Sequence, residues 1–191
     1  MEISIAAGKP LENPKPAVLS NDIWWMIPSL TQNTQDEHEE NKPVDTGKVI
    51  YFKNGELSMW LPDGFKSDES SKNCYIEIFL KDNYGIIQVN KINNNDKLTL
   101  TELVDGWNSD HVGQGKTYFK KLDSREEIIN DLPLYIGIYD MKANDNAILR
   151  SEILFTVKGD QIYVFNFIAD ISIFDKMRIE FERIIKSIDL H

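Results

Sequence analysis

The sequence predicts an α+β fold in which helices pack on a mostly antiparallel twisted sheet. Three observations lead to this fold class. Short runs rich in Ile, Val, Tyr and Phe are separated by turn residues, two segments carry a helical apolar stripe, and one late strand is apolar on both faces. A chain of 191 residues suits one domain with a substantial core better than two domains.

The first part of the chain, residues 1–47, reads as an N-terminal arm. Pro10, Pro14 and Pro16 lie close together, and the stretch "TQNTQDEHEENKP" is polar without any apolar periodicity. Both features are typical of a loop or tether. The domain itself is therefore expected to span residues 48–191.

One segment of the arm, residues 23–30, is strongly apolar. Its four consecutive residues from Trp24 to Ile27 match no amphipathic period, so a stable surface helix is not expected. Burying one such side chain stabilises by about 1.5–3 kcal/mol, which disfavours leaving them all in water. We expect the segment either to dock on its own domain, over part of the sheet or an edge strand, or to anchor a partner through Trp24, Trp25 and Met26.

The domain is expected to open with a β-hairpin. The runs "VIYFK" and "ELSMWLP" are joined by Asn54-Gly55, the dipeptide that most strongly favours a tight hairpin turn. Leu57, Met59 and Leu61 share one face of the second run. The runs "CYIEIFL" and "GIIQVNKI" predict a further strand pair.

The stretch "TLTELVDGWNSDH" predicts the first helix. Thr99 and Glu102 have the spacing of a capping box, with Thr99 as the N-cap. The residues that follow form one helical stripe: Leu100, Leu103, Val104, Trp107 and His111.

The second half predicts a strand meander and a closing helix. A turn is expected at Asp131-Leu132-Pro133, and Gly159-Asp160 links the last two strands. Ser172 is the expected N-cap of the closing helix. The apolar stripe of that helix consists of Phe174, Met177, Phe181, Ile184, Ile185 and Ile188.

The strand "QIYVFNFIAD" is apolar on both faces. Tyr163, Phe165 and Phe167 lie on one face, and Val164, Asn166 and Ile168 lie on the other. Such a strand is central and covered on both sides. One cover is expected to be the two helices, and the other the arm, a homodimer mate or a client. Tyr163, Phe165 and Phe167 of this strand are therefore further candidates for partner binding. Trp60, in the run "ELSMWLP", is another candidate.

Charge and composition exclude several function classes. The net charge of −10 argues against nucleic-acid binding and against docking on an anionic membrane. It favours a basic protein partner, or it simply keeps the protein soluble. No stretch is long and apolar enough to span a membrane. The start "MEISIAAGKP" does not read as a secretory signal, so the cytoplasm is the expected compartment, or the periplasm if a leader has been removed.

No catalytic, metal or cofactor site is predicted. His38, His111 and His191 are dispersed, and Cys74 is in phase with core residues of its strand. The stretch "DHVGQGKT" resembles the tail of a phosphate-binding loop, but it follows a helix and has Asp110 in place of the first glycine. Its glycines are expected to let the chain leave the helix.

From about residue 48 to 189 the pattern resembles the PsbP/DcrB-like superfamily. The resemblance rests on "LSMWLPDGF", "IIQVNKI" followed by "LTLTELVDGW", "DLPLYIGIYD", "ILFTVKGDQIYVFNFIAD" and the final "FERIIKSI". This superfamily includes an extrinsic photosystem protein, DcrB-type proteins and the Eag chaperones of type VI secretion effectors. The resemblance implies an α/β/α sandwich that is used for binding proteins.

Three functions follow as hypotheses. The first is a non-enzymatic protein-binding protein, such as a chaperone or adaptor for a secreted effector that carries an apolar segment. The second is an immunity protein whose acidic surface blocks the basic cleft of a toxin. The third is an enzyme with an unrecognised carboxylate site.

Overall fold

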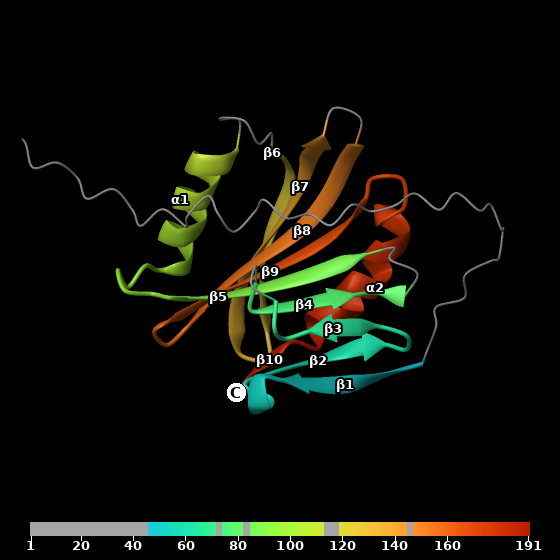
Figure 1. The fold of residues 1–191 in the computed structure, drawn as a ribbon. Helices are drawn as coiled ribbons and strands as arrows, with labels where there is room; N and C mark the ends of the chain where they lie inside the picture. Colours follow the sequence, from blue (N-terminus) through green and yellow to red (C-terminus); the bar gives the residue numbers. More distant parts are fainter. Residues whose placement is uncertain (1–45, 72–73, 82–84, 113–118, 145–146) are drawn as a thin grey trace, which may run out of the picture.

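The computed structural model describes residues 46–71, 74–81, 85–112, 119–144 and 147–191 (Figure 1). The predictions for Trp24, Trp25 and Met26, for the apolar segment 23–30 and for the glycines of "DHVGQGKT" lie outside these residues. The first described strand, β1, begins at Gly47. The division of the chain into an arm, residues 1–47, and a domain from residue 48 onward stays a prediction.

A small three-stranded sheet is built around the predicted hairpin. Its strands, in spatial order, are β1 (Gly47–Phe52), β2 (Leu57–Pro62) and β10 (Asp189–Leu190), and all its pairings are antiparallel. The turn between β1 and β2 contains Asn54 at φ 58° and Gly55 at φ 91°, which confirms the predicted hairpin. Asn and Gly suit this turn because they adopt a positive φ more readily than other residues.

A seven-stranded antiparallel sheet forms the body of the fold. Its strands, in spatial order, are β3 (Lys66–Asp68), β4 (Ile76–Phe79), β5 (Ile86–Asn93), β9 (Gln161–Asp170), β8 (Ala147–Lys158), β7 (Leu132–Asn144) and β6 (Phe119–Ile129). The turn between β6 and β7 lies at Asn130-Asp131, both with positive φ, so Leu132 and Pro133 already belong to the strand. The turn prediction was thus displaced by one residue.

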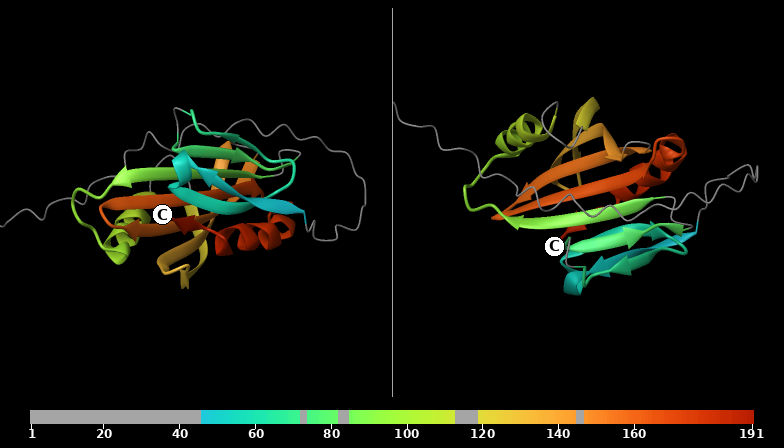
Figure 2. Two further views of the ribbon diagram at one scale, coloured as in Figure 1. Left: turned by 90° about the horizontal axis from the view of Figure 1, so that it is seen from below. Right: turned by 45° about the horizontal axis from the view of Figure 1, so that its top comes forward.

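The central strand β9 is buried on both faces, as predicted. Phe165 and Phe167 belong to a core that also contains α2 (Phe174–Lys186) and the small sheet, whereas Val164 and Ile168 belong to a second core with α1 (Leu100–His111). The two helices therefore lie on opposite faces of the large sheet (Figure 2). The expectation that both helices share one cover was wrong, because the small sheet joins α2 in covering one face while α1 covers the other.

The two helices differ in how they begin. Thr99 caps α1 with the full predicted capping box: its hydroxyl accepts from the Glu102 amide, and the Glu102 carboxylate accepts from the Thr99 amide. The N-cap of α2 is Ile173 and not Ser172, because the Ser172 hydroxyl donates to Asp170 instead. No side chain caps α2, so this helix is held in place by the packing of its apolar stripe against the core.

A hydrogen-bonded network at Glu56 ties the hairpin of the small sheet to the large sheet. The Glu56 carboxylate accepts from Lys91 Nζ on β5, from the Tyr163 hydroxyl on β9 and from the Tyr75 hydroxyl just before β4. These hydrogen bonds, that from Lys91 first, lower the pKa of Glu56 to about 2. The ionised carboxylate therefore stabilises the junction between the two sheets.

We expect Glu56→Gln to lower the melting temperature at pH 7 by about 3–6 °C, because a charged acceptor worth about 1–2 kcal/mol at a partly solvated site is lost. The pKa of Glu56 is lower in the folded than in the unfolded chain. The stabilisation is therefore complete above pH 4.5 and is lost as the pH falls towards about 2.

Thermal denaturation over this pH range measures the effect, and the gap between wild type and variant should close at the acidic end. The exposed Glu126→Gln is the matched control and should change little at any pH. A gap that stays constant down to the lowest pH would contradict this account of Glu56.

Candidate functional site

The outer face of the small sheet carries an exposed apolar surface. We define the β1–β2 surface as Val49, Tyr51, Trp60, Arg183 and His191. Val49 and Tyr51 are 51% and 65% exposed, although both are large apolar residues in a strand. They point outward because Ile50 and Phe52, with the opposite alternation, pack into the core. This surface is the strongest candidate for an interaction site among the described residues.

Trp60 is held at the centre of this surface. The guanidinium of Arg183, from α2, lies 3.8 Å from the centre of a Trp60 ring, and the Trp60 amide donates to the Ser187 hydroxyl at 2.7 Å. Gly47 also lies so close to the indole that a Cβ at this position would overlap it. Trp60 is thus half-buried and rigidly oriented, which lowers the entropy that a contact with a partner would cost.

At its other end, the β1–β2 surface combines Tyr51 of β1 with His191, which follows β10. The rings of Tyr51 and His191 are stacked with their centres 6.1 Å apart, and a His191 ring nitrogen lies 3.1 Å from the Ser58 hydroxyl. Aromatic and arginine side chains of this kind are enriched in the energetic centres of protein interfaces. The arrangement suits the binding of an apolar or aromatic segment.

Of these five residues, only Trp60 was predicted from the sequence as a candidate for partner binding. The run "VIYF" is apolar on both faces, and that signal alone could have identified Val49 and Tyr51 as an outward-facing pair. Arg183 and His191 carry no such signal, because the fold brings them to β1 and β2 from over 120 residues away in sequence.

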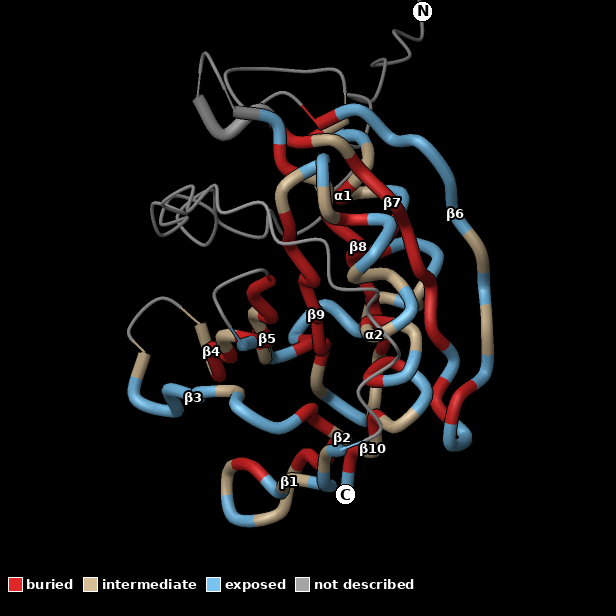
Figure 3. Tube along the Cα trace, turned by 90° about the vertical axis from the view of Figure 1, so that its right-hand side faces the viewer, coloured by how far each residue is buried: buried red, intermediate tan, exposed pale blue. Residues whose placement is uncertain are grey.

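The aromatic residues predicted on β9 lie elsewhere. Phe165 and Phe167 have no exposed surface, and Tyr163 is buried with its hydroxyl bound to Glu56. Figure 3 shows that nearly the whole of β9 is buried. A partner would reach them only if α2 or the small sheet moved away. Their predicted contact with a partner stays a prediction, as does that of Trp24, Trp25 and Met26.

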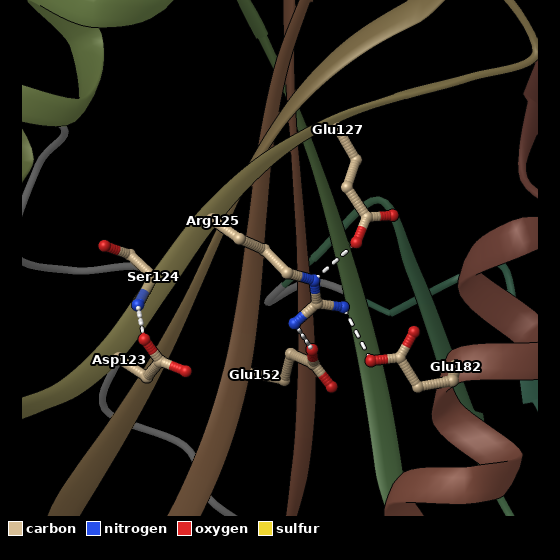
Figure 4. Close-up of polar contacts among 6 residues, drawn as sticks. All are labelled: Asp123, Ser124, Arg125, Glu127, Glu152 and Glu182. Carbon is tan, nitrogen blue, oxygen red and sulfur yellow. Dashed lines mark hydrogen bonds and ion pairs between the residues drawn. The ribbon is translucent and has the colours of Figure 1, made fainter.

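A charged cluster of Arg125 and three glutamates lies between β6, β8 and α2 (Figure 4). The Arg125 guanidinium donates to Glu127 at 2.6 Å, to Glu152 at 2.9 Å and to Glu182 at 2.6 Å. Glu152 is fully buried, and burial raises its pKa while the charge of Arg125 opposes that rise. The cluster ties the edge strand β6 to the helix on the same face of the sheet.

This cluster does not have the arrangement of an acid–base pair. One oxygen of each carboxylate is bound to the same guanidinium, and Glu152 is closed off from solvent. Within the part of the chain that the structure describes, no group of three or more His, Cys, Asp or Glu residues could hold a metal ion. Cys74 is half-buried, and burial raises the pKa of its thiol, which makes it a poor nucleophile.

Among the described residues, none of the helices could cross a membrane. No protein-family model matches the sequence, and a search of curated proteins found no match. Structural similarity to solved proteins is clear, although the sequence identities are low.

Three solved structures illustrate this similarity. Cyanobacterial PsbP (CyanoP) from Synechocystis has a TM-score of 0.59 at 13% identity, covering 76% of this chain and 93% of that protein. LpqN, involved in cell envelope biogenesis of Mycobacterium tuberculosis, has a TM-score of 0.55 at 10% identity, covering 76% and 90%. The Ran-binding protein Mog1p from Saccharomyces cerevisiae has a TM-score of 0.52 at 10% identity, covering 76% and 95%. The chain therefore has a PsbP-like α+β fold, which confirms the predicted fold class.

We expect Arg125→Ala to reduce the free energy of unfolding by about 2–4 kcal/mol at pH 7, because it leaves the buried Glu152 carboxylate without its cation. The loss should become smaller at pH 5, where Glu152 is more easily protonated. Urea denaturation at the two pH values measures both effects.

Two further variants test the cause. Adding Glu152→Gln to Arg125→Ala should restore part of the stability by removing the unpaired charge, whereas Lys120→Ala on the exposed side of the same strand should change little. Equal losses in the single and double variants would show that packing, and not charge, explains the effect of Arg125.

Proposed function

We propose that this chain is a non-enzymatic protein-binding protein and that the β1–β2 surface is its binding site. The single observation that carries the proposal is the exposure of Val49 and Tyr51 beside the oriented Trp60. Large apolar side chains on a rigid scaffold favour association because their burial removes apolar area from water.

The position of β1 suits a partner that supplies an extended segment. β1 is the terminal strand of the small sheet, and among the described residues it pairs only with β2. An extended segment can bind such an edge through main-chain hydrogen bonds while its alternate side chains contact the outer face. The partner is therefore expected to carry a short apolar stretch.

The finer class that we propose is a chaperone or adaptor for a secreted effector. The sequence resemblance to effector chaperones and the exposed apolar side chains of the β1–β2 surface support it. The Saccharomyces cerevisiae neighbour is described as Ran-binding, so this fold has at least one member with a protein partner. The cytoplasmic location that we also propose would agree with this role.

The alternative that we keep is an immunity protein that neutralises a toxin. The net charge of −10 supports it, because a strongly acidic protein associates rapidly with a basic catalytic cleft. The identity of the partner distinguishes the two: an effector protected until its secretion indicates the chaperone, and an enzyme inhibited by binding indicates immunity.

Affinity purification from the native cell, followed by measurement of the Kd for the recovered partner, tests the site. We expect Tyr51→Ala to weaken binding at least tenfold, as for a residue at an energetic centre. Ile128→Ala is the matched control, since Ile128 is 77% exposed but lies on β6 in the other sheet. If both variants bind as tightly as the wild type, the β1–β2 surface is not the site.

A further inference from the structure

We propose that residues 23–27 of the arm add to the free edge of β1 as a fourth strand of the small sheet. The segment then lies beside Val49 and Tyr51, at the β1 side of the β1–β2 surface. This docking does not depend on any partner. Only its consequence for binding, stated below, rests on the proposed function.

The edge strands β6 and β1 differ in how they are protected against pairing. The long edge strand β6 is protected by a register irregularity between Lys121 and Asp123 and by exposed charged side chains along its length. β1 has neither a bulge nor a proline, and it presents Val49 and Tyr51 to solvent. An edge with exposed apolar residues and few protective charges is expected to be covered.

The sequence of the segment is suited to a strand. Residues 23–27, "IWWMI", have the length and composition of a strand, and they are bounded by Asn21-Asp22 and Pro28. Alternation places Trp24 and Trp25 on opposite faces. Whichever face lies outward, one indole ring is placed next to the exposed side chains of Val49 and Tyr51.

The chain between the segment and β1 is long enough for the segment to lie along β1. The described chain begins at residue 46, directly before β1, so the arm is covalently tethered at this edge. The connection from residue 28 to residue 46 spans about 22–26 Å if it is flexible. β1 has six residues and is about 20 Å long. The segment can therefore lie along the whole strand, at the high effective concentration that a tether provides.

Opposite charges lie on the connecting residues and beside β1. The connection contains the acidic run "DEHEE" at residues 36–40. Lys48 lies near the start of β1, and Lys53 follows its end. Attraction between the acidic run and these lysines favours a connection that stays close to the small sheet in this acidic protein.

Occupation of β1 has a consequence for binding. A partner segment that uses the same edge must displace residues 23–27, so the arm would act as an internal competitor. Removing the competitor raises the apparent affinity for the partner, since the binding-competent state becomes fully populated.

Hydrogen exchange of the purified full-length chain tests the docking without any partner. We compare the wild type with the double variant Trp24→Ser/Trp25→Ser. We expect the β1 amides that point away from β2 to exchange at least tenfold faster in the variant, while β5 and β9 are unchanged. The matched control is Val18→Ser/Leu19→Ser, which removes two apolar residues of the arm outside the segment and should leave β1 as in the wild type.

Three results would overturn the proposal. The first is equal exchange of the β1 amides in the wild type and the tryptophan variant. The second is faster exchange in the Val18→Ser/Leu19→Ser control as well. The third is protection of β1 that disappears on dilution, which would assign the edge to a second copy of the chain. Because no partner is present, these outcomes are distinct from a failure of the partner-binding experiment.

Discussion

The fold depends on one constraint, which is that β9 is apolar on both faces and must be covered on both. Phe165 and Phe167 face one way, and Val164 and Ile168 face the other. A single layer of helices cannot cover both sets. The chain meets this requirement with α1 on one side, and with α2 and the small sheet on the other, so that a sandwich forms around the large sheet.

The small sheet owes its exposed surface to this role. Its inner face, with Leu57, Met59 and Leu61, packs into the core that covers one face of β9, so Val49 and Tyr51 on its outer face stay exposed. The Glu56 network fixes the hairpin against β5 and β9. The β1–β2 surface is therefore an apolar area on a rigid support, and both properties favour binding with a low entropic cost.

Charge has different roles at the two long edges of the fold. At β6 the exposed charges protect the strand, and Arg125 neutralises the buried Glu152 while joining the strand to α2. At β1 protective charges are few, and apolar side chains take their place. This contrast singles out β1 as the edge where another segment is most readily accommodated, whether that segment belongs to this chain or to a partner.

The sequence by itself determined the local features of this protein. The capping box at Thr99, the hairpin at Asn54-Gly55 and the two apolar faces of β9 follow from interactions within a few residues, and the structure contains each of them. Ser172 failed as an N-cap because Asp170 accepts from its hydroxyl. Only the tertiary structure decided that the helices lie on opposite faces, that the hairpin forms its own sheet and that Arg183 and His191 meet Trp60 and Tyr51. Those arrangements depend on strand pairing and packing between residues far apart in the chain, for which local periodicity carries no information.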